Sequence, residues 1–293
     1  MLTRAALFVT ALLILPPLSL TVAELEWLPP PVLSGAVWLP AAITLGMLAM
    51  AMLMFDALAA RRSGVRLLHS QRGYLAWCAV AGALLGALSG WLNLFAGLWV
   101  SAAATPGAAI LLAALCGALA LPTVLLARLW LAGLPGLARL NRVGLTLPAL
   151  PGEATARVLL LLALGSLSAG VAWPGFPAAL FWSAPLWLLV ALQLLWHEGT
   201  LFAGLPRGDW SRVLHGMLAG LLVGGLLLSA WRLASGALHL NGAPWQIALA
   251  CALYGLTALQ LGDLVAEHWR GKPRSEVFKR KPFPIPVVSK KDQ

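Results

Sequence analysis

Histidine and carboxylate side chains recur near the corresponding ends of three long apolar segments of the chain. His197 and Glu198 end one segment, His215 lies near the start of the next, and Asp263 lies near the end of the last. Ionisable groups inside membrane spans are costly to bury, so each is a candidate for function. If these segments are neighbouring helices, their side chains form one polar cluster, made up of His197, Glu198, His215, Asp263, Glu267 and His268.

The first interpretation of this polar cluster is structural. Asp263 then pairs with Arg212 or Arg128, because an arginine is the partner that a carboxylate near a membrane surface needs. The other side chains of the cluster then lie in the hydrated headgroup layer and carry no chemistry.

Two other interpretations assign chemistry to the cluster. In the redox interpretation, His197 and His215 are the two axial ligands of a b-type haem, or histidine and carboxylate groups exchange protons with a quinone. In the enzymatic interpretation, every member of the cluster except Glu267 takes part in acid–base or metal-dependent catalysis. No spacing typical of a metalloenzyme is present, so we predict no metal site and leave the catalytic residues unassigned.

The elements that position this cluster must be membrane helices. Of 293 residues, 60% are apolar and only 10% are charged, whereas soluble domains carry about 25% charged residues. No charged residue occurs from Gly73 to Ala127 or from Val158 to Trp196. Since a bilayer-spanning helix needs about 20 residues, each of these runs holds two spans.

The apolar pattern predicts an all-α polytopic membrane bundle, because backbone polar groups inside lipid must be satisfied within helices. No alternating strand pattern competes with this fold. Eight spans are expected, over residues 5–23, 32–56, 73–99, 107–130, 157–173, 178–198, 212–233 and 245–268.

Basic residues predict the orientation of these spans. Threaded alternately through a membrane, the chain places 19 of its 20 Lys and Arg residues on one side, and only Arg232 on the other. Basic residues mark the cytoplasmic side, so we predict a bacterial cytoplasmic membrane protein with both termini in the cytoplasm. The net charge of +10 then reflects topology, and nucleic-acid binding is not expected. Residues 1–23 also fit a cleavable signal peptide.

Glycine spacing indicates an internal duplication. Gly82, Gly86 and Gly90 recur at every fourth residue of the third span, and Gly216, Gly220 and Gly224 do so in the seventh. Such stripes let another helix approach closely. The fourth and eighth spans each hold a mid-span cysteine, Cys116 and Cys251. The alternative is coincidence in Leu-, Ala- and Gly-rich spans.

The duplication divides the chain into four parts. These are a first four-helix half over residues 1–130, a basic linker over 131–156, a second four-helix half over 157–269 and a basic tail over 270–293. Within the linker, residues 134–143 fit either a short interfacial helix or a plain loop. The tail carries eight basic residues against two acidic ones. It is expected to contact anionic lipid or to bind other protein subunits.

Two kinds of uncharged side chain inside the spans also attract attention. Asn93 and Gln193 are amides, for which we expect interhelical hydrogen bonds. Trp182 and Trp187 lie further inside a span than the other tryptophans and either flank a planar ligand or pack in the core.

Sequence features that are absent exclude or disfavour several classes of membrane protein. No lysine occurs before residue 270, which excludes a retinal Schiff base, and no nucleotide-binding loop is present. Acids near mid-membrane are limited to Asp263, which disfavours an ion-driven carrier.

We therefore predict a non-catalytic anchor subunit of a respiratory or other redox complex, interacting with quinone or holding a b-type haem. The predicted architecture is similar to that of the quinone-linked anchor subunits of molybdoenzyme-type complexes, which also pair four-helix bundles. None of their sequence motifs occurs here, so the similarity concerns architecture alone. The alternatives are a small transporter or lipid-handling permease with its path between the halves and, third, a membrane-embedded acid–base or metal enzyme.

Overall fold

A computed structural model describes residues 38–101, 106–140, 145–147, 152–173, 177–196, 198–234, 238–240 and 243–270. Seven helices within these ranges are long and apolar enough to cross a membrane. They are α2 (Trp38–Ser63), α4 (Arg72–Ala96), α5 (Pro106–Ala132), α7 (Gly152–Ala172), α8 (Ala178–Leu195), α9 (Ser211–Leu233) and α10 (Pro244–Arg270). The prediction of a polytopic helical bundle is confirmed. The expected span 5–23 and nearly all of the tail 270–293 lie outside the described residues.

Short elements connect the long helices outside the spans. They are α3 (Leu67–Ser70), α6 (Pro135–Leu140), a 3-10 turn (Leu205–Arg207) and the strands β1 (Trp99–Ser101) and β2 (Leu238–Leu240). The strands pair antiparallel and place Val100 opposite His239. This ribbon joins the segment after α4 to the segment after α9, so corresponding loops of the two expected halves meet.

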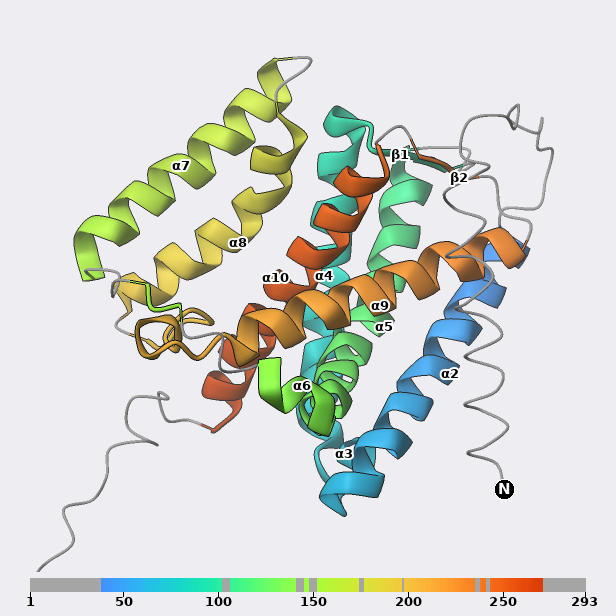
Figure 1. The fold of residues 1–293 in the computed structure, drawn as a ribbon. Helices are drawn as coiled ribbons and strands as arrows, with labels where there is room; N and C mark the ends of the chain where they lie inside the picture. Colours follow the sequence, from blue (N-terminus) through green and yellow to red (C-terminus); the bar gives the residue numbers. More distant parts are fainter. Residues whose placement is uncertain are drawn as a thin grey trace, which may run out of the picture.

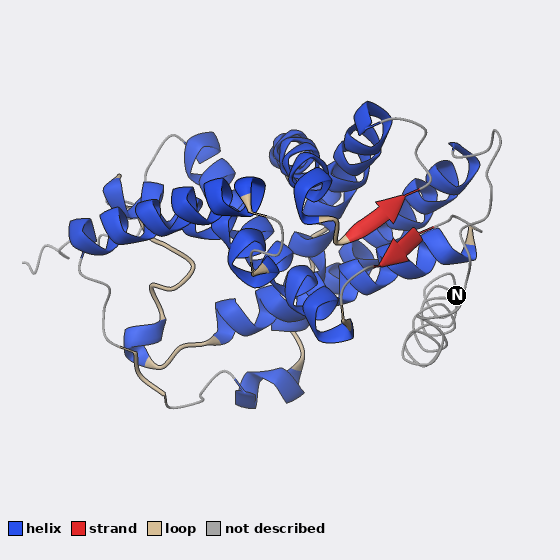
Figure 2. Ribbon diagram, turned by 90° about the horizontal axis from the view of Figure 1, so that it is seen from above, coloured by secondary structure: helices blue, strands red, loops and turns tan. Residues whose placement is uncertain are grey.

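The helices α4, α5, α9 and α10 form the centre of the molecule (Figure 1). On one side, α2 packs against α5 and α9, and on the other, α8 packs against α10 and carries α7 on its far side. Figure 2 shows the same arrangement from above. The main apolar core draws side chains from the central helices and from α2 and α8. In α7, by contrast, apolar side chains such as Leu161 are exposed, as expected of a helix that faces lipid.

Two predicted boundaries were wrong. The second span was expected to end at Asp56, but α2 continues to Ser63. Asp56 is buried, and its carboxylate accepts a hydrogen bond from the backbone N–H of Leu68 at 3.2 Å. The carboxylate of Asp56 therefore makes a contact inside the protein and does not lie at a membrane surface. The helix α2 ends before Gly64, whose φ of 73° suits the left-handed region.

The other wrong boundary is the start of the fifth span, because α7 begins at Gly152 inside the expected linker. Glu153 in its first turn favours this start, since a negative charge stabilises a helix N-terminus. Glu153 also forms an exposed ion pair with Arg157 at 3.1 Å. Of the two expectations for residues 134–143, the structure contains a helix, α6, over Pro135–Leu140, and residues 141–143 lie outside the described residues.

Arginines gather at one end of the bundle. Within the described residues, all arginines except Arg232 belong to the end at which α2, α5, α8 and α10 terminate and α4, α7 and α9 begin. We call this the basic end; in Figure 1 the short helices α3 and α6 lie at its lower part. Cytoplasmic placement of this end remains a prediction.

Glycine residues allow the backbones of α4 and α5 to come into direct contact. An added Cβ on Gly117 would collide with the carbonyl oxygen of Gly82 and lie 2.8 Å from the Cα of Gly86. An added Cβ on Gly86 would collide with the carbonyl oxygen of Ala113, and one on Gly90 would lie 2.9 Å from the Ala113 Cβ. Only glycine permits this approach.

The pair α9 and α10 repeats this contact position by position. An added Cβ on Gly255 would collide with the carbonyl oxygen of Gly216 and lie 2.6 Å from the Cα of Gly220. One on Gly220 would collide with the carbonyl oxygen of Cys251, and one on Gly224 would lie 2.9 Å from the Cys251 Cβ.

This correspondence sets the register of the two pairs. Gly117 is equivalent to Gly255, and Ala113 is equivalent to Cys251. Cys116 and Cys251 both lie inside their helices, as expected, but the contact equivalent to that of Cys251 is made by Ala113, three residues before Cys116. The shared contacts support the duplication, which we retain as a proposal.

Candidate ligand cavity and polar cluster

The best defined contact of the polar cluster joins Asp263 of α10 to Arg212 of α9. The Arg212 guanidinium donates to a carboxylate oxygen of Asp263, and each side chain is 18% exposed. Next to this pair, the Tyr74 hydroxyl of α4 donates to the carbonyl oxygen of Gly262 at 3.1 Å. Three of the central helices are thus joined by polar contacts at the basic end.

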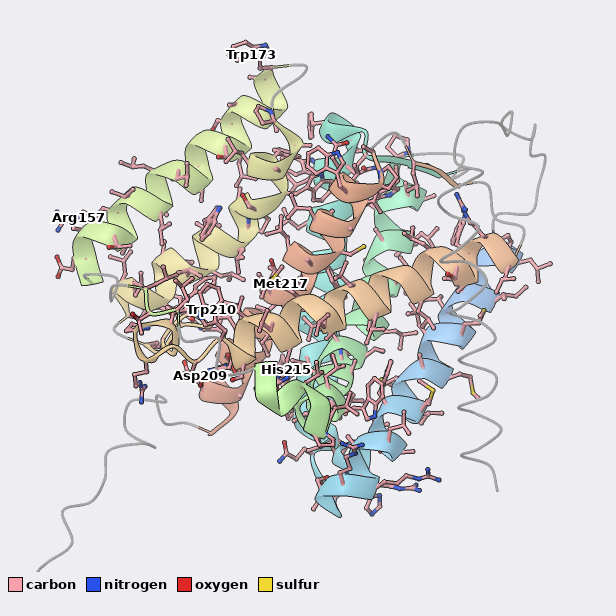
Figure 3. The ribbon with its side chains drawn as sticks, in the orientation of Figure 1. Arg157, Trp173, Asp209, Trp210, His215 and Met217 are labelled. Carbon is pink, nitrogen blue, oxygen red and sulfur yellow. The ribbon has the colours of Figure 1, made fainter. Side chains whose placement is uncertain are left out.

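His215 lies one turn after Arg212 on α9. Its side chain is buried, and its Nε2 atom has no hydrogen-bond partner within the described residues. Figure 3 shows His215 and Asp209 towards the start of α9. Asp209 accepts the backbone N–H of Ser211 at 3.0 Å, and its hydrogen bonds to Ser211 lower the pKa of its carboxyl group.

The remaining cluster residues are only partly placed. His197 and the side chain of His268 lie outside the described residues. Glu198 donates its backbone N–H to the carbonyl oxygen of Gln193, and its Oε2 atom is buried. Glu267 is buried one turn after Asp263. The described residues contain no group of three His, Cys, Asp or Glu side chains that could hold a metal ion.

The two intramembrane amides do not behave as expected. Within the part of the chain that the structure describes, Asn93 bonds to the loop after its own helix and not to another helix. It accepts the backbone N–H of Trp99 at 3.1 Å and donates to the carbonyl oxygen of Trp99 at 2.6 Å. Gln193 is almost fully buried, and neither atom of its amide group has a partner within the described residues.

A cavity of about 250 Å³ lies between the two glycine-joined helix pairs. Its walls come from α4, α5, α8, α9 and α10, and residues of the β1–β2 ribbon lie at its edge. Gly86 and Gly117 of one pair and Gly220 and Gly224 of the other contribute to its lining. The glycine stripes therefore do two things: they bring helices together within each pair and leave space between the pairs.

The cavity is apolar except for a few hydrogen-bond donors. None of the described residues that line it is charged. Trp182, Trp231 and Tyr254 line it, and the indole N–H groups and the phenol hydroxyl of these residues are buried without a hydrogen-bond partner within the described residues. Leaving a buried donor unsatisfied costs about 1–3 kcal/mol. Because these donors belong to side chains that line the cavity, they are the candidate partners of a ligand that accepts hydrogen bonds.

Trp182 lines the cavity and also packs against Trp99, with 5.3 Å between the ring centroids, so the structure agrees with both alternatives for this residue. Trp231 is 6% exposed and lines the cavity, which was not predicted from the sequence. Tyr254 was not identified from the sequence either. One signal was available, because α10 carries a polar residue at every third position over Tyr254, Thr257, Gln260 and Asp263.

Comparison of the chain with protein-family models, curated proteins and solved structures found no match in any of the three.

Proposed function

We propose that this protein is a quinone-interacting membrane subunit that anchors a redox complex to the bilayer. The observation that carries the proposal is the uncharged cavity with Trp182, Trp231 and Tyr254 at its walls. A quinone has an apolar ring and tail and two carbonyl oxygens that accept hydrogen bonds. A phospholipid would bring a phosphate group, for which the cavity offers no positive charge.

The size of the cavity is suitable for a quinone ring. An apolar cavity of about 150 Å³ accommodates benzene, so the space of about 250 Å³ accommodates a substituted quinone ring with the start of its tail. A much smaller hollow shares Leu98, Trp182 and Ala250 with the cavity and lies between α8 and α10. A tail leaving the cavity between these helices would reach the lipid.

The anchoring role is supported by charge. The basic end carries nearly all the arginines of the described helices, and the chain continues from it into a tail with eight basic residues. A soluble subunit with an acidic surface would bind there, and electrostatic attraction would speed its association.

The permease alternative loses one of its supports. Sliding of the halves along the glycine stripes is disfavoured at Gly82 and Gly216, which contact helices of their own halves, whereas Gly86, Gly220 and Gly224 also line the cavity between the pairs. The haem alternative depends on His197, which lies outside the described residues, and His215 does not line the cavity.

Purification of the protein from native membranes in mild detergent tests the proposal. We expect an isoprenoid quinone in the organic extract, identified by mass spectrometry, together with co-purifying soluble subunits. A Soret band would instead favour the haem alternative. A chain that carries neither quinone nor partner subunits would contradict the proposal.

The two tyrosines of the chain provide a matched pair of variants. Tyr254→Phe removes a buried hydroxyl without a partner in the described residues, so we expect the ligand-free protein to gain about 1 kcal/mol in unfolding free energy. The same change should weaken quinone binding about tenfold, because a hydrogen bond to the ligand is lost. Titration with a denaturing detergent measures the unfolding free energy, and quinone binding in nanodiscs measures the affinity.

Tyr74→Phe is the control, since the Tyr74 hydroxyl donates to the carbonyl oxygen of Gly262 and does not line the cavity. This variant should lose about 1 kcal/mol of unfolding free energy and bind quinone as the wild type does. Equal behaviour of the two variants would show that Tyr254 has no special role.

A further inference from the structure

A line of polar residues on α10 connects the cavity to the basic end. Tyr254, Thr257, Gln260 and Asp263 follow one another at intervals of three residues, and Glu267 follows one turn later. Residues three and four apart are neighbours on a helix surface, with about 5–6 Å between their Cβ atoms. The remainder of this span is largely apolar, so the line is the polar ridge of α10.

The cavity end of the ridge is formed by Tyr254 and Thr257, which both line the cavity. The Tyr254 hydroxyl has no partner within the described residues. Thr257 is buried and donates its hydroxyl proton to the carbonyl oxygen of Leu253 at 2.8 Å, which leaves its lone pairs available. Two residues that line the cavity therefore bring one hydroxyl without a partner in the described residues and, one turn on, one that is bonded to the backbone.

The middle of the ridge is Gln260, which is fully buried. Its Oε1 atom accepts the backbone N–H of Leu201 at 2.8 Å, which holds the amide in one orientation. Its Nε2 atom has no hydrogen-bond partner within the described residues. Buried polar groups of this kind are commonly satisfied by an internal water molecule.

The far end of the ridge reaches the polar contacts of the basic end. Asp263 pairs with Arg212, Glu267 is buried one turn later, and the Tyr74 hydroxyl donates to the carbonyl oxygen of Gly262. Carboxylates at this position can accept a proton from the interior and exchange it with water at the surface.

We propose that the polar ridge of α10 is a proton route between the cavity and the basic end, with Gln260 holding a water molecule that carries the proton between Thr257 and Asp263. The inference rests on the proposed quinone function, since a bound quinone is what exchanges protons at Tyr254. Gln260 is a positioning residue in this route, and its amide keeps its own protons.

Electrons and protons balance in the proposed reduction. Reduction of a quinone to the quinol takes up two electrons and two protons, and one O–H bond forms at each carbonyl oxygen. The electrons come from a one-electron redox centre of the partner subunits, such as an iron–sulfur cluster. The protons enter from water at the basic end and pass along the ridge; in quinol oxidation both flows reverse.

Voltammetry of the full chain in a bilayer tethered to an electrode tests the route, because the electrode supplies the electrons without a partner subunit. The probe is a decyl-substituted benzoquinone at saturating concentration, with binding checked separately by tryptophan fluorescence. Gln260→Leu and Thr257→Val should each slow the proton-coupled reduction of bound quinone by about 10²-fold, the lower end of the contribution of positioned proton transfer. In heavy water the slowed rates should fall further, whereas a purely structural defect would show no added isotope effect.

Gln193→Leu is the matched control, because Gln193 is an equally buried amide on α8 that neither lines the cavity nor belongs to the ridge. It should leave the reduction rate unchanged. Wild-type rates in both Gln260→Leu and Thr257→Val would overturn the route while leaving the quinone site intact. Failure of the wild type to bind the probe at all would overturn the proposed function, and the route with it.

Discussion

Replacing Asp263 by asparagine is expected to lower the unfolding free energy by about 3 kcal/mol. The change leaves the Arg212 guanidinium largely buried without the carboxylate that it contacts, and breaking a buried ion pair from one side costs about 3–5 kcal/mol. The lower value applies because both side chains keep some exposure. Unfolding by a denaturing detergent, followed by circular dichroism in mixed micelles, measures the loss.

The exposed pair between Glu153 and Arg157 supplies the control. Its side chains are 63% and 73% exposed, so Glu153→Gln should cost at most about 0.5 kcal/mol. Exchanging the two charges in the double variant Arg212→Asp, Asp263→Arg should recover part of the loss. Equal losses in Asp263→Asn and Glu153→Gln would show that the buried pair does not hold α9 and α10 together.

Replacing Gly220 by alanine is expected to cost about 2–3 kcal/mol, at the upper end for overpacking a core. The added Cβ would collide with the carbonyl oxygen of Cys251 and lie 2.7 Å from the Cα of Gly255. These are backbone atoms, so no side chain can move aside, and the two helices must separate. The same unfolding measurement applies.

Gly225 on the same helix is the control, since nothing lies within 4 Å of a Cβ added there. Gly225→Ala should leave stability unchanged or raise it slightly, because alanine favours helices. If the halves are duplicates, Gly86→Ala should cost as much as Gly220→Ala, because Gly86 makes the equivalent contact with Ala113. Similar stability of the Gly220 and Gly225 variants would contradict the backbone contact.

The fold was largely predictable because lipid allows few solutions. Uncharged runs, basic loops and glycine spacing each depend on local sequence, and they located all seven described spans to within a few residues except at two boundaries. Both errors arose from charges. The charge of Asp56 was taken to mark the end of a span at the membrane surface, although its buried carboxylate accepts a hydrogen bond from Leu68. Glu153 was assigned to the linker, although it belongs to the first turn of α7.

The candidate site was less predictable because it depends on which helices are neighbours. Asp263 and Arg212 were paired correctly as one option, since opposite charges near one surface have few partners. Tyr254 and Trp231 were not identified as cavity residues, because an aromatic residue in a span has the same local pattern whether it faces a cavity, lipid or another helix. Only the packing of α8 and the two helix pairs distinguishes these cases.

The register of the duplication was also beyond the sequence. The sequence pairs the two helices only through a mid-span cysteine in each, whereas the contacts of Gly117 and Gly255 make Ala113 and Cys251 the corresponding residues. Alanine and cysteine are both small enough to lie against a glycine. Different residue types therefore occupy the equivalent positions 113 and 251, and the sequence alone does not reveal that they correspond.

The most direct test of the quinone cavity is a fluorescence titration of the purified protein in nanodiscs with decyl-substituted benzoquinone. Trp99, Trp182 and Trp231 line the cavity, so binding there should quench tryptophan emission in a saturable way. Ala250→Phe, which fills part of the cavity, should abolish the saturable component, whereas Ala42→Phe on the exposed side of α2 should retain it. Non-saturable quenching that is identical in all three proteins would contradict the cavity as a quinone site.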